Sequence, residues 1–522
     1  MNRKILALVL SAILLFTAIP AAFAELTLPA PAASTSRDTM NVAIAQDANG
    51  FCPITSGYSQ AVLVVTRNVY EGLVWRDTSG NIAPILATEY AWDEDGLGLT
   101  FKLREGVTFT NGEAFDADDV VWTYRDFYLN TSFGASENVF DFANIEKIDD
   151  YTVHIPMLKK AGDALALLCD TKYDIMNQQA VEEAGDFYVV KPVGTGPYVL
   201  ESYVEGDGMV LTANPNYWGG VPAITTINVR IIPESTQVMI EMENGNIDLS
   251  LNPSKADCYA ALQGDFPGIV AHEFSDGNVM CLYFNYRKDW AQNKSVRECI
   301  SYAINKDDIM MAAYEGLAKT ANQMMGRVYA DSYIDEYDEN PLYSYDPDKA
   351  IEKLAESGYA PGELTMDFFV DQDNAAGLTA QVIKNNLEAV GINVNVGVFD
   401  SQAWVGNVLA GEGDIHVNIG CSGNGYPISY LSNSDPNKTP NWDDYASYAD
   451  SKRVFEFYTK AQEASDPAEI FRYVQDGVRI VAEEALCVPL VETQGQVLMR
   501  EELKGVVYYS DNYFSYMGAY FE

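Results

Sequence analysis

The sequence predicts an α/β fold that is divided over more than one domain. Apolar residues recur at helical spacing in some segments and at every second position in others, and the two kinds of segment follow one another. Residues 379–390, for example, have a helical pattern, and residues 391–394 begin a strand. Because the chain has 522 residues, 48% of them hydrophobic, two or three domains with sizeable cores are expected.

Residues 1–24 have the pattern of a secretion signal. Arg3 and Lys4 give a positive start, residues 5–19 form an apolar core, and Ala-Phe-Ala ends the segment as a cleavage site. The apolar run is shorter than the ~20 residues that a membrane span needs. We therefore expect cleavage after Ala24 and a mature protein in the periplasm or outside the cell. No cysteine lies at the cleavage point, so no lipid anchor is expected.

The composition excludes some partners and leaves the thiol chemistry open. A net charge of -42 makes a surface that repels nucleic acid and anionic lipid. The acidic excess mainly confers solubility, and an attraction for cationic ligands is the alternative. The seven cysteines have no Cys-x-x-Cys spacing, and an odd number outside the cell leaves at least one without a disulfide. We expect buried thiols, with one or two disulfides as the alternative.

Residues 99–128 predict two strands followed by a capped helix. The alternation over residues 101–104 indicates a half-buried strand, and Asn-Gly at residues 111–112 supplies a tight turn. Asp116 is placed to cap the helix, and Asp119 lies near its positive end. The apolar stripe of this helix consists of Val120, Tyr124, Phe127 and Tyr128.

This segment closely resembles the diagnostic segment of the extracytoplasmic solute-binding proteins of family 5, the oligopeptide, dipeptide and nickel receptors of ABC importers. Other runs typical of the family are spread over most of the chain: Glu-Gly-Leu at 71–73, Gly-Thr-Gly-Pro-Tyr at 194–198, Asn-Pro-Asn-Tyr-Trp at 214–218 and the helical stretch 295–304. The two glycines at 194–198 lack the Gly-Lys-Ser/Thr end of a P-loop, so a structural turn is expected there.

The resemblance implies a two-lobe periplasmic-binding-protein-like fold of type II, with an extra subdomain in the first lobe and a two-strand hinge. Strands at 279–286 and 486–491 are the expected crossings. The implied parts follow in chain order: a flexible leader over 25–39, lobe I over 40–283 with an inserted subdomain at about 61–196, lobe II over 284–488, and a return to lobe I over 489–522.

The same resemblance implies the substrate-binding component of an ABC importer. It would be a monomer that closes its lobes over a peptide or an oligosaccharide and delivers this ligand to a membrane permease. No cofactor or metal is expected, because the three histidines are far apart, and there is no Gly-x-Ser-x-Gly, His-Glu-x-x-His or EF-hand motif to indicate an enzyme. A secreted hydrolase and a surface interaction protein are the alternatives.

Residues 414–430 are the most informative candidate for the ligand site. In peptide-binding relatives this region carries Gly-Trp-x-x-Asp, whose carboxylate binds the α-amine of the peptide. Matching Gly420 to that glycine places Cys421 at the tryptophan and Asn424 at the aspartate. An amide carries no charge, so this match favours neutral ligands such as oligosaccharides. The alternative is that residues 422–425 form only a turn.

Four further residues and one neighbour of Asn424 complete the predicted site. Tyr58 and Gln60 precede the first helix in a loop that faces the cleft in relatives, with solvent exposure as the alternative. Asn285 lies in the first expected crossing strand and binds either the ligand or the hinge. Trp404 is a stacking platform or, slightly favoured, part of the core. Tyr426 either stacks on the ligand or caps the turn.

Overall fold

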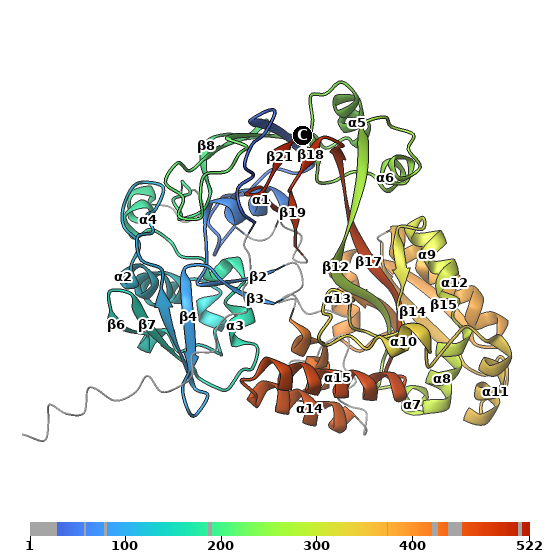
Figure 1. The fold of residues 1–522 in the computed structure, drawn as a ribbon. Helices are drawn as coiled ribbons and strands as arrows, with labels where there is room; N and C mark the ends of the chain where they lie inside the picture. The colour runs from blue at the N-terminus through green and yellow to red at the C-terminus, as the bar shows by residue number, and fades with distance from the viewer. Residues whose placement is uncertain are drawn as a thin grey trace, which may run out of the picture.

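The structure is a computed structural model that describes residues 29–56, 59–77, 81–185, 191–372, 374–419, 426–436, 451–509 and 514–522. Two bodies, lobe I and lobe II, are joined by the long strands β12 (Ile269–Phe284) and β17 (Cys487–Arg500) (Figure 1). Each body has its own large hydrophobic core. The predicted two-lobe α/β fold with a two-strand hinge is therefore confirmed.

One eleven-stranded sheet runs through both lobes. Its order is β15-β14-β16-β12-β17-β11-β1-β10-β9-β8, and β13 (Ala318–Thr320) also pairs with β17. The hinge strands thus lie in the middle of the sheet, with lobe II strands on one side and lobe I strands on the other. None of the helices in the described part of the chain is long and apolar enough to span a bilayer.

Lobe I is organised around β1, which pairs in parallel with β10 on one side and β11 on the other. Met40, Val42 and Ile44 alternate along β1 and are all buried, as a strand inside a sheet requires. The elements of this lobe are β1 (Thr39–Ile44), α1 (Gln60–Val69), β8 (Tyr198–Val204), β9 (Gly208–Ala213), β10 (Thr226–Ile231), α5 (Ser235–Glu243), β11 (Leu249–Ser250) and α6 (Lys255–Leu262).

A second, antiparallel sheet of order β4-β5-β7-β6 forms a subdomain within lobe I. Its elements are β2 (Val74–Arg76), β3 (Ile82–Pro84), β4 (Ala87–Trp92), β5 (Gly98–Leu103), α2 (Ala117–Val121), β6 (Glu146–Asp149), β7 (Thr152–Pro156), α3 (Ala164–Leu167) and α4 (Gln178–Ala184). Asp116 caps α2 as predicted, and Asp119 completes a capping box by accepting the Asp116 backbone N–H at 2.9 Å. The predicted apolar stripe is buried, although the helix continues as a π-helical turn from Trp122.

Three of the runs that carry the family resemblance meet at the buried carboxylate of Glu71. The Thr195 hydroxyl donates to its Oε2 at 2.7 Å. The Tyr217 hydroxyl donates to Oε1 at 2.8 Å, and the Trp218 indole N–H to Oε2 at 3.0 Å. A Cβ atom on Gly194 would overlap the backbone at the end of α1. The Gly-Thr-Gly-Pro-Tyr run is therefore a structural turn, as predicted, held tightly against α1.

Lobe II packs helices around the strands β14 (Thr365–Asp371), β15 (Asn393–Phe399) and β16 (Ile415–Ile419). β14 pairs in parallel with β15 and with β16, the arrangement expected of alternating strands and helices. The helices are α7 (Asp289–Gln292), α8 (Lys294–Ala303), α9 (Lys306–Tyr314), α10 (Glu336–Glu339), α11 (Pro347–Ser357), α12 (Asn374–Ala389), α13 (Ser401–Leu409), α14 (Ser451–Glu463) and α15 (Pro467–Glu483).

The chain after β17 and the chain before β1 lie together on lobe I. The short pairs β18 (Leu503–Lys504) with β21 (Tyr520–Phe521), and β19 (Val507–Tyr508) with β20 (Phe514–Ser515), place apolar side chains in the lobe I core. Within the stretch predicted as a leader, Thr35 accepts the Phe521 backbone N–H at 3.0 Å, and the Ser36 N–H donates to the Phe521 carbonyl at 3.0 Å. Residues 35–36 are therefore fixed to the last strand.

The hinge strands pair in antiparallel fashion along nearly their full length, with a bulge between Ser275 and Val279. The first crossing strand begins at Ile269, well before the predicted start at residue 279. The bulge explains this difference, because Gly277 adopts a left-handed conformation and gives the sequence the signature of a turn. Two continuous strands thus connect the lobes.

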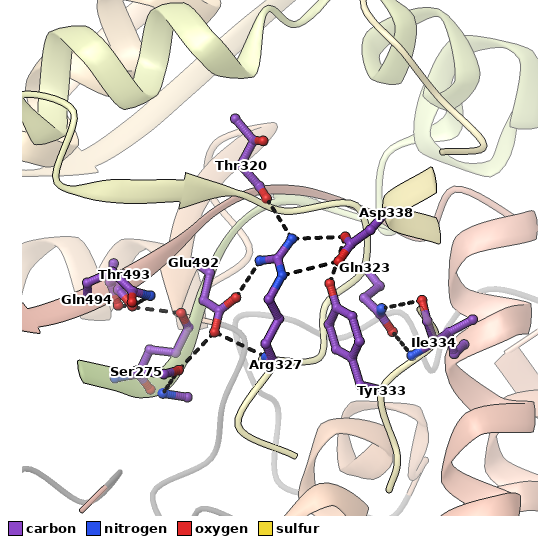
Figure 2. Close-up of polar contacts among 12 residues, drawn as sticks. Ser275, Thr320, Gln323, Arg327, Tyr333, Ile334, Asp338, Glu492, Thr493 and Gln494 are labelled. Carbon is purple, nitrogen blue, oxygen red and sulfur yellow. Dashed lines mark hydrogen bonds and ion pairs between the residues drawn. The ribbon is translucent and has the colours of Figure 1, made fainter. Parts of the chain in front are cut away.

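A buried carboxylate fixes β17 to lobe II next to that bulge (Figure 2). Glu492 is 1% exposed, and its Oε1 accepts the Ser275 hydroxyl at 2.8 Å and the Arg327 backbone N–H at 3.1 Å. The Arg327 guanidinium donates to Glu492 Oε2 at 2.6 Å. It also donates to both oxygens of Asp338, which accepts the Tyr333 hydroxyl at 2.8 Å. These groups form a connected network between a hinge strand and the loop after β13.

Candidate ligand site between the lobes

A cavity of about 660 Å³ lies between the subdomain of lobe I and lobe II. We call it the inter-lobe cavity. The lobe I wall includes Asn81, Ile82, Tyr90, Trp92, Gly162 and Leu165, and the lobe II wall includes Asp331, Tyr426, Asp466, Phe471, Arg472 and Gln475. The volume lies within the range of roughly 300–1,000 Å³ that is common for small-molecule sites. Both lobes contribute to the walls, so their relative position decides the shape of the cavity.

The lobe I wall is built on β4. Tyr90 and Trp92 are two residues apart and project from the same face of the strand, because successive side chains alternate. Tyr90 packs against Phe101 of the neighbouring strand β5, with ring centroids 6.5 Å apart. Trp92 is half-buried and packs against the lobe I core. The rings on this wall are thus supported from behind by the subdomain sheet.

The lobe II wall is built on the first turns of α15. Asp466 caps this helix by accepting the Ala468 backbone N–H at 3.0 Å, and Pro467 occupies the first helical position. Phe471 follows about one turn later and packs against Tyr426, with ring centroids 6.2 Å apart. Tyr426 is 4% exposed, and burial, followed by the charge of Asp163, raises the pKa of its hydroxyl. Its ring therefore stays neutral at physiological pH.

The charged groups of the lining interact within their own lobe. The Asp466 carboxylate is used as the helix cap described above. The Arg472 guanidinium lies 4.4 Å from the Tyr473 ring centroid and 3.9 Å from the Glu469 carboxylate, along the same helix. The walls therefore offer a ligand aromatic and apolar side chains together with polar ones such as Asn81, Asp331 and Gln475.

The two lobes touch near α3, which lies on the same side of the molecule as α14 and α15 (Figure 1). The Gly162 backbone N–H donates to the Gln462 carbonyl at 2.8 Å. A Cβ atom on Gly162 would overlap the Ala461 carbonyl oxygen, so only glycine allows this approach. Ala166 of α3 belongs to the core of lobe II rather than to that of lobe I. This contact is called the far contact below, because it lies away from the hinge strands.

Asp163 is an acid enclosed by the far contact. Its side chain is 7% exposed, and burial raises the pKa of the carboxyl to about 6. The positive charge of Lys159 and a hydrogen bond from the Gln462 side chain oppose this rise. Its charge also acts on Tyr426 and Tyr458 of lobe II. An acid with a raised pKa thus lies between two bodies that a hinge connects.

Comparison with known proteins identifies the class of this two-lobed molecule. The model of the bacterial extracellular solute-binding proteins, family 5, middle region, matches residues 81–441. This chain belongs to that family. Heme-binding protein A from Haemophilus influenzae is 30% identical over 433 residues, which are 77% of either chain. Di/tripeptide-binding protein 2 from Pseudomonas aeruginosa is 26% identical over 477 residues, 84% of this chain and 87% of that one.

A solved structure gives the same result for the fold. The structure of HbpA2 from Haemophilus parasuis superimposes on this family 5 protein with a TM-score of 0.83 at 21% identity. The superposition covers 93% of this chain and 100% of that one. At this level of identity the likeness concerns the fold alone.

Two of the six predicted ligand-binding residues of this family 5 protein, Tyr58 and Asn424, lie outside the described residues. Their roles stay predictions. Of the others, Gln60 begins α1, and its Nε2 donates to the Leu251 carbonyl at 3.1 Å within lobe I. Tyr426 is the predicted residue that lines the inter-lobe cavity.

Asn285 and Trp404 make contacts within lobe II. The Asn285 amide donates to the carbonyls of Gly411 at 2.9 Å and Gly413 at 2.8 Å, directly after the hinge strand β12. Trp404 is 7% exposed, and its indole N–H donates to the Phe369 carbonyl at 3.3 Å. These contacts correspond to the hinge and core roles that were the alternatives for the two residues.

Apart from Tyr426, the aromatic residues of the cavity walls named above were not among the predicted site residues. Tyr90, Trp92 and Phe471 were not singled out by the sequence analysis. A period-2 pair of aromatic residues at the end of a strand was the available sequence signal for the lobe I wall. The lobe II wall of the cavity comes from α15, which follows β4 by hundreds of residues. No local sequence pattern could show that these two segments face one another.

Proposed function

We propose that this protein is the solute-binding component of an ABC importer, and that it captures short peptides between its lobes and passes them to a membrane permease. The observation that carries this proposal is the inter-lobe cavity, whose walls come from both lobes while two strands connect them. A ligand in such a cavity contacts both lobes only when they are closed. Differential affinity for the closed form then drives closure.

Peptides are the ligand class that one named relative and the cavity lining support, whereas the other named relative is a heme-binding protein. The relative from Pseudomonas aeruginosa is a di/tripeptide-binding protein by name. Aromatic side chains such as Tyr90, Trp92 and Phe471 provide apolar surface for the side chains of a peptide. The same rings would stack on sugars, so an oligosaccharide is the ligand against which the proposal must be tested.

The proposal includes a location and excludes catalysis. The predicted signal over 1–24 would send the protein to the periplasm or the cell exterior, in keeping with the extracellular family to which it belongs. The relatives named above are binding proteins rather than enzymes. We therefore infer that the ligand leaves the cavity unchanged, and that a membrane permease rather than a second enzyme is the partner.

A thermal-shift panel on residues 25–522 tests the proposal. Di- to pentapeptides form one set and oligosaccharides the other, and hits are followed by calorimetry and small-angle scattering. A ligand at 100 times its dissociation constant adds about 2.7 kcal/mol to stability, which raises the melting temperature visibly. Peptide hits with a more compact scattering profile are the expected result.

Two other results would contradict the proposal. Sugar hits without peptide hits would show that the ligand class is wrong. Peptide cleavage products in the mass spectrum of the incubated mixture would show a hydrolase, and the loss of those products in a carboxylate variant would locate its catalytic acid.

A further inference from the structure

The far contact is built so that it forms and breaks as a unit. Its backbone hydrogen bond joins Gly162, on the loop before α3, to the Gln462 carbonyl at the end of α14. The last carbonyls of a helix have no partner within the helix, so a donor from elsewhere must satisfy them. When the lobes separate, water replaces this donor, and neither lobe loses an internal hydrogen bond. The far contact can therefore open without unfolding anything.

The environment of Asp163 opposes a negative charge in the closed form. The carboxyl is enclosed by the contact beside the Gln462 side chain at the end of α14, and the loss of water around it disfavours the charged form. In the described part of the chain, the Gln462 side chain donates a hydrogen bond to it, and the other groups that face it are a lysine and two tyrosines. Lys159, on its own segment, is exposed, and Tyr458 of α14 and Tyr426 before α15 are neutral tyrosines. Beyond them, Asp435 acts on Tyr458 and Arg76 acts on Tyr426.

We propose that Gly162 and Asp163 form an inter-lobe latch that closes with uptake of a proton by the Asp163 carboxyl, so that the protein retains its ligand more tightly in acidic surroundings. Gly162 permits the close approach, and Asp163 is a positioning residue that acts on the ligand only through the lobes. The proposal rests on the proposed function, because it concerns retention of a ligand between the lobes.

The sign follows from the two protonation equilibria. In the open form Asp163 faces water, and an exposed aspartate has a pKa of about 3.9. In the closed form burial raises the pKa to about 6. Between these values the closed form holds a proton that the open form lacks, so closure becomes more favourable as the pH falls from 7 to 5. Above about pH 7 and below about pH 3 the two forms carry the same charge, and the dependence ends.

The test measures the dissociation constant and dissociation rate of one peptide at pH 7 and pH 5. The probe is the tripeptide without titrating side chains that gives the largest shift in the thermal panel. For the parent chain we expect about tenfold tighter binding at pH 5, mostly through a slower dissociation rate. Asp163→Asn carries a neutral side chain at both pH values, as the fully protonated parent would, so it should bind about a hundredfold more tightly than the parent at pH 7 and about tenfold more tightly at pH 5. It should also lose the pH dependence.

A matched variant separates the latch from general effects of acid. The pKa of Asp119 is also raised, to about 7 by burial, but this residue belongs to the capping box of α2 and lies within lobe I. Asp119→Asn should keep the pH dependence of the parent. Titration of the peptide itself affects all variants equally and cancels in the comparison.

The other possible results of this test separate a failure of the latch proposal from a failure of the proposed function. If peptides bind and Asp163→Asn keeps the pH dependence of the parent, the latch proposal fails and the proposed function stands. If no peptide binds at either pH, the proposed function fails, and the latch fails with it. A variant that does not fold is recognised from its melting curve, and Asp163→Ser, also neutral, then replaces it with the same expectation.

Discussion

At the hinge, β12 and β17 form one continuous antiparallel pair in the middle of the sheet, while at the far contact the lobes share the backbone hydrogen bond from Gly162 to Gln462. At the hinge a buried, fully paired carboxylate, Glu492, locks the strand in place. At the far contact the enclosed carboxylate, Asp163, has a raised pKa. The first region resists separation, and the second is suited to reversible separation.

This contrast assigns different measurable quantities to the two regions. Changes at the hinge should alter the free energy of unfolding, because the hinge is paired whether the lobes are open or closed. Changes at the far contact should alter ligand affinity, since that contact exists only in the closed form. A variant that shifts the wrong quantity would break the comparison.

The largest effect is expected from Glu492→Ala. The substitution leaves the Ser275 hydroxyl and two donors of Arg327 without their acceptor, so the free energy of unfolding should fall by about 3 kcal/mol. Denaturant unfolding of the mature chain, followed by probes in each lobe, measures the loss. Asp338→Asn is the control. It changes the half-exposed carboxylate that binds the other side of the same guanidinium, and it should lower the free energy of unfolding by less than about 1 kcal/mol. Equal losses of stability for the two variants would show that the buried Glu492 carboxylate contributes no more to the network than Asp338 does.

The next largest effect is expected from Gly326→Ala beside the hinge bulge. A Cβ atom there would overlap the Gly277 carbonyl oxygen, which is backbone and cannot move aside easily. We expect a loss of about 2 kcal/mol of stability. Gly406→Ala is the matched control, because a Cβ atom inside α13 meets nothing within 4 Å and should add up to about 1 kcal/mol. If Gly326→Ala leaves the free energy of unfolding unchanged, the bulge is free to shift.

Gly162→Ala should lower the affinity for peptides and leave the free energy of unfolding nearly unchanged, the reverse of the two hinge variants. The added Cβ atom prevents the close approach to Ala461, so the closed form is disfavoured and peptide affinity should fall about tenfold, the effect of losing roughly 1.4 kcal/mol. The free energy of unfolding should change by less than about 0.5 kcal/mol, since the backbone atoms that the added Cβ atom would meet, those of Ala461 and Ala464, belong to lobe II. Calorimetry and denaturant unfolding on the same preparation provide both numbers. A large loss of stability with unchanged affinity would mean that the far contact is permanent.

The smallest effect is expected from Phe471→Ala in the inter-lobe cavity. Removing this ring deletes apolar surface that a bound peptide would cover, so affinity should fall about fivefold, most for peptides with large apolar side chains. Calorimetry with a phenylalanine-containing and an alanine-containing tripeptide measures the difference. Leu409→Ala, which shortens a 41% exposed side chain on α13, serves as the control and should leave both affinities unchanged. Equal losses for the two peptides would show that Phe471 does not contact their side chains.

The parts of the fold that local physics determines were predictable from the sequence. Asp116 and Asp119 have the spacing of a capping box, and the structure contains that capping box. The hinge strands were expected through the family resemblance at 279–286 and 486–491, but the start of β12 and the end of β17 were missed. A glycine at positive φ within a bulge has the same sequence signature as a turn, and only pairing with β17 distinguishes the two.

The site was less predictable, because it depends on relations between distant segments. Tyr426 was found through the family resemblance, whereas Trp92 and Phe471 face one cavity only because a hinge brings β4 and α15 together. The role of Gly162 could not be seen either. A glycine in a loop is unremarkable until a helix end of the other lobe lies against it. Likewise, the segments that meet at Glu71 were each recognisable, but their meeting is a property of the folded chain.

The adjacency of residues 35–36 and Phe521 makes lobe I the body that holds both ends of the described chain, with lobe II inserted between β12 and β17. A short linker could therefore join these ends, and new termini could be opened in a surface turn of lobe II. Such a circular permutant would place a fluorescent reporter on the moving lobe while leaving the hinge ladder continuous. Closure over a ligand would then become an optical signal, and the molecule would serve as the frame of a sensor.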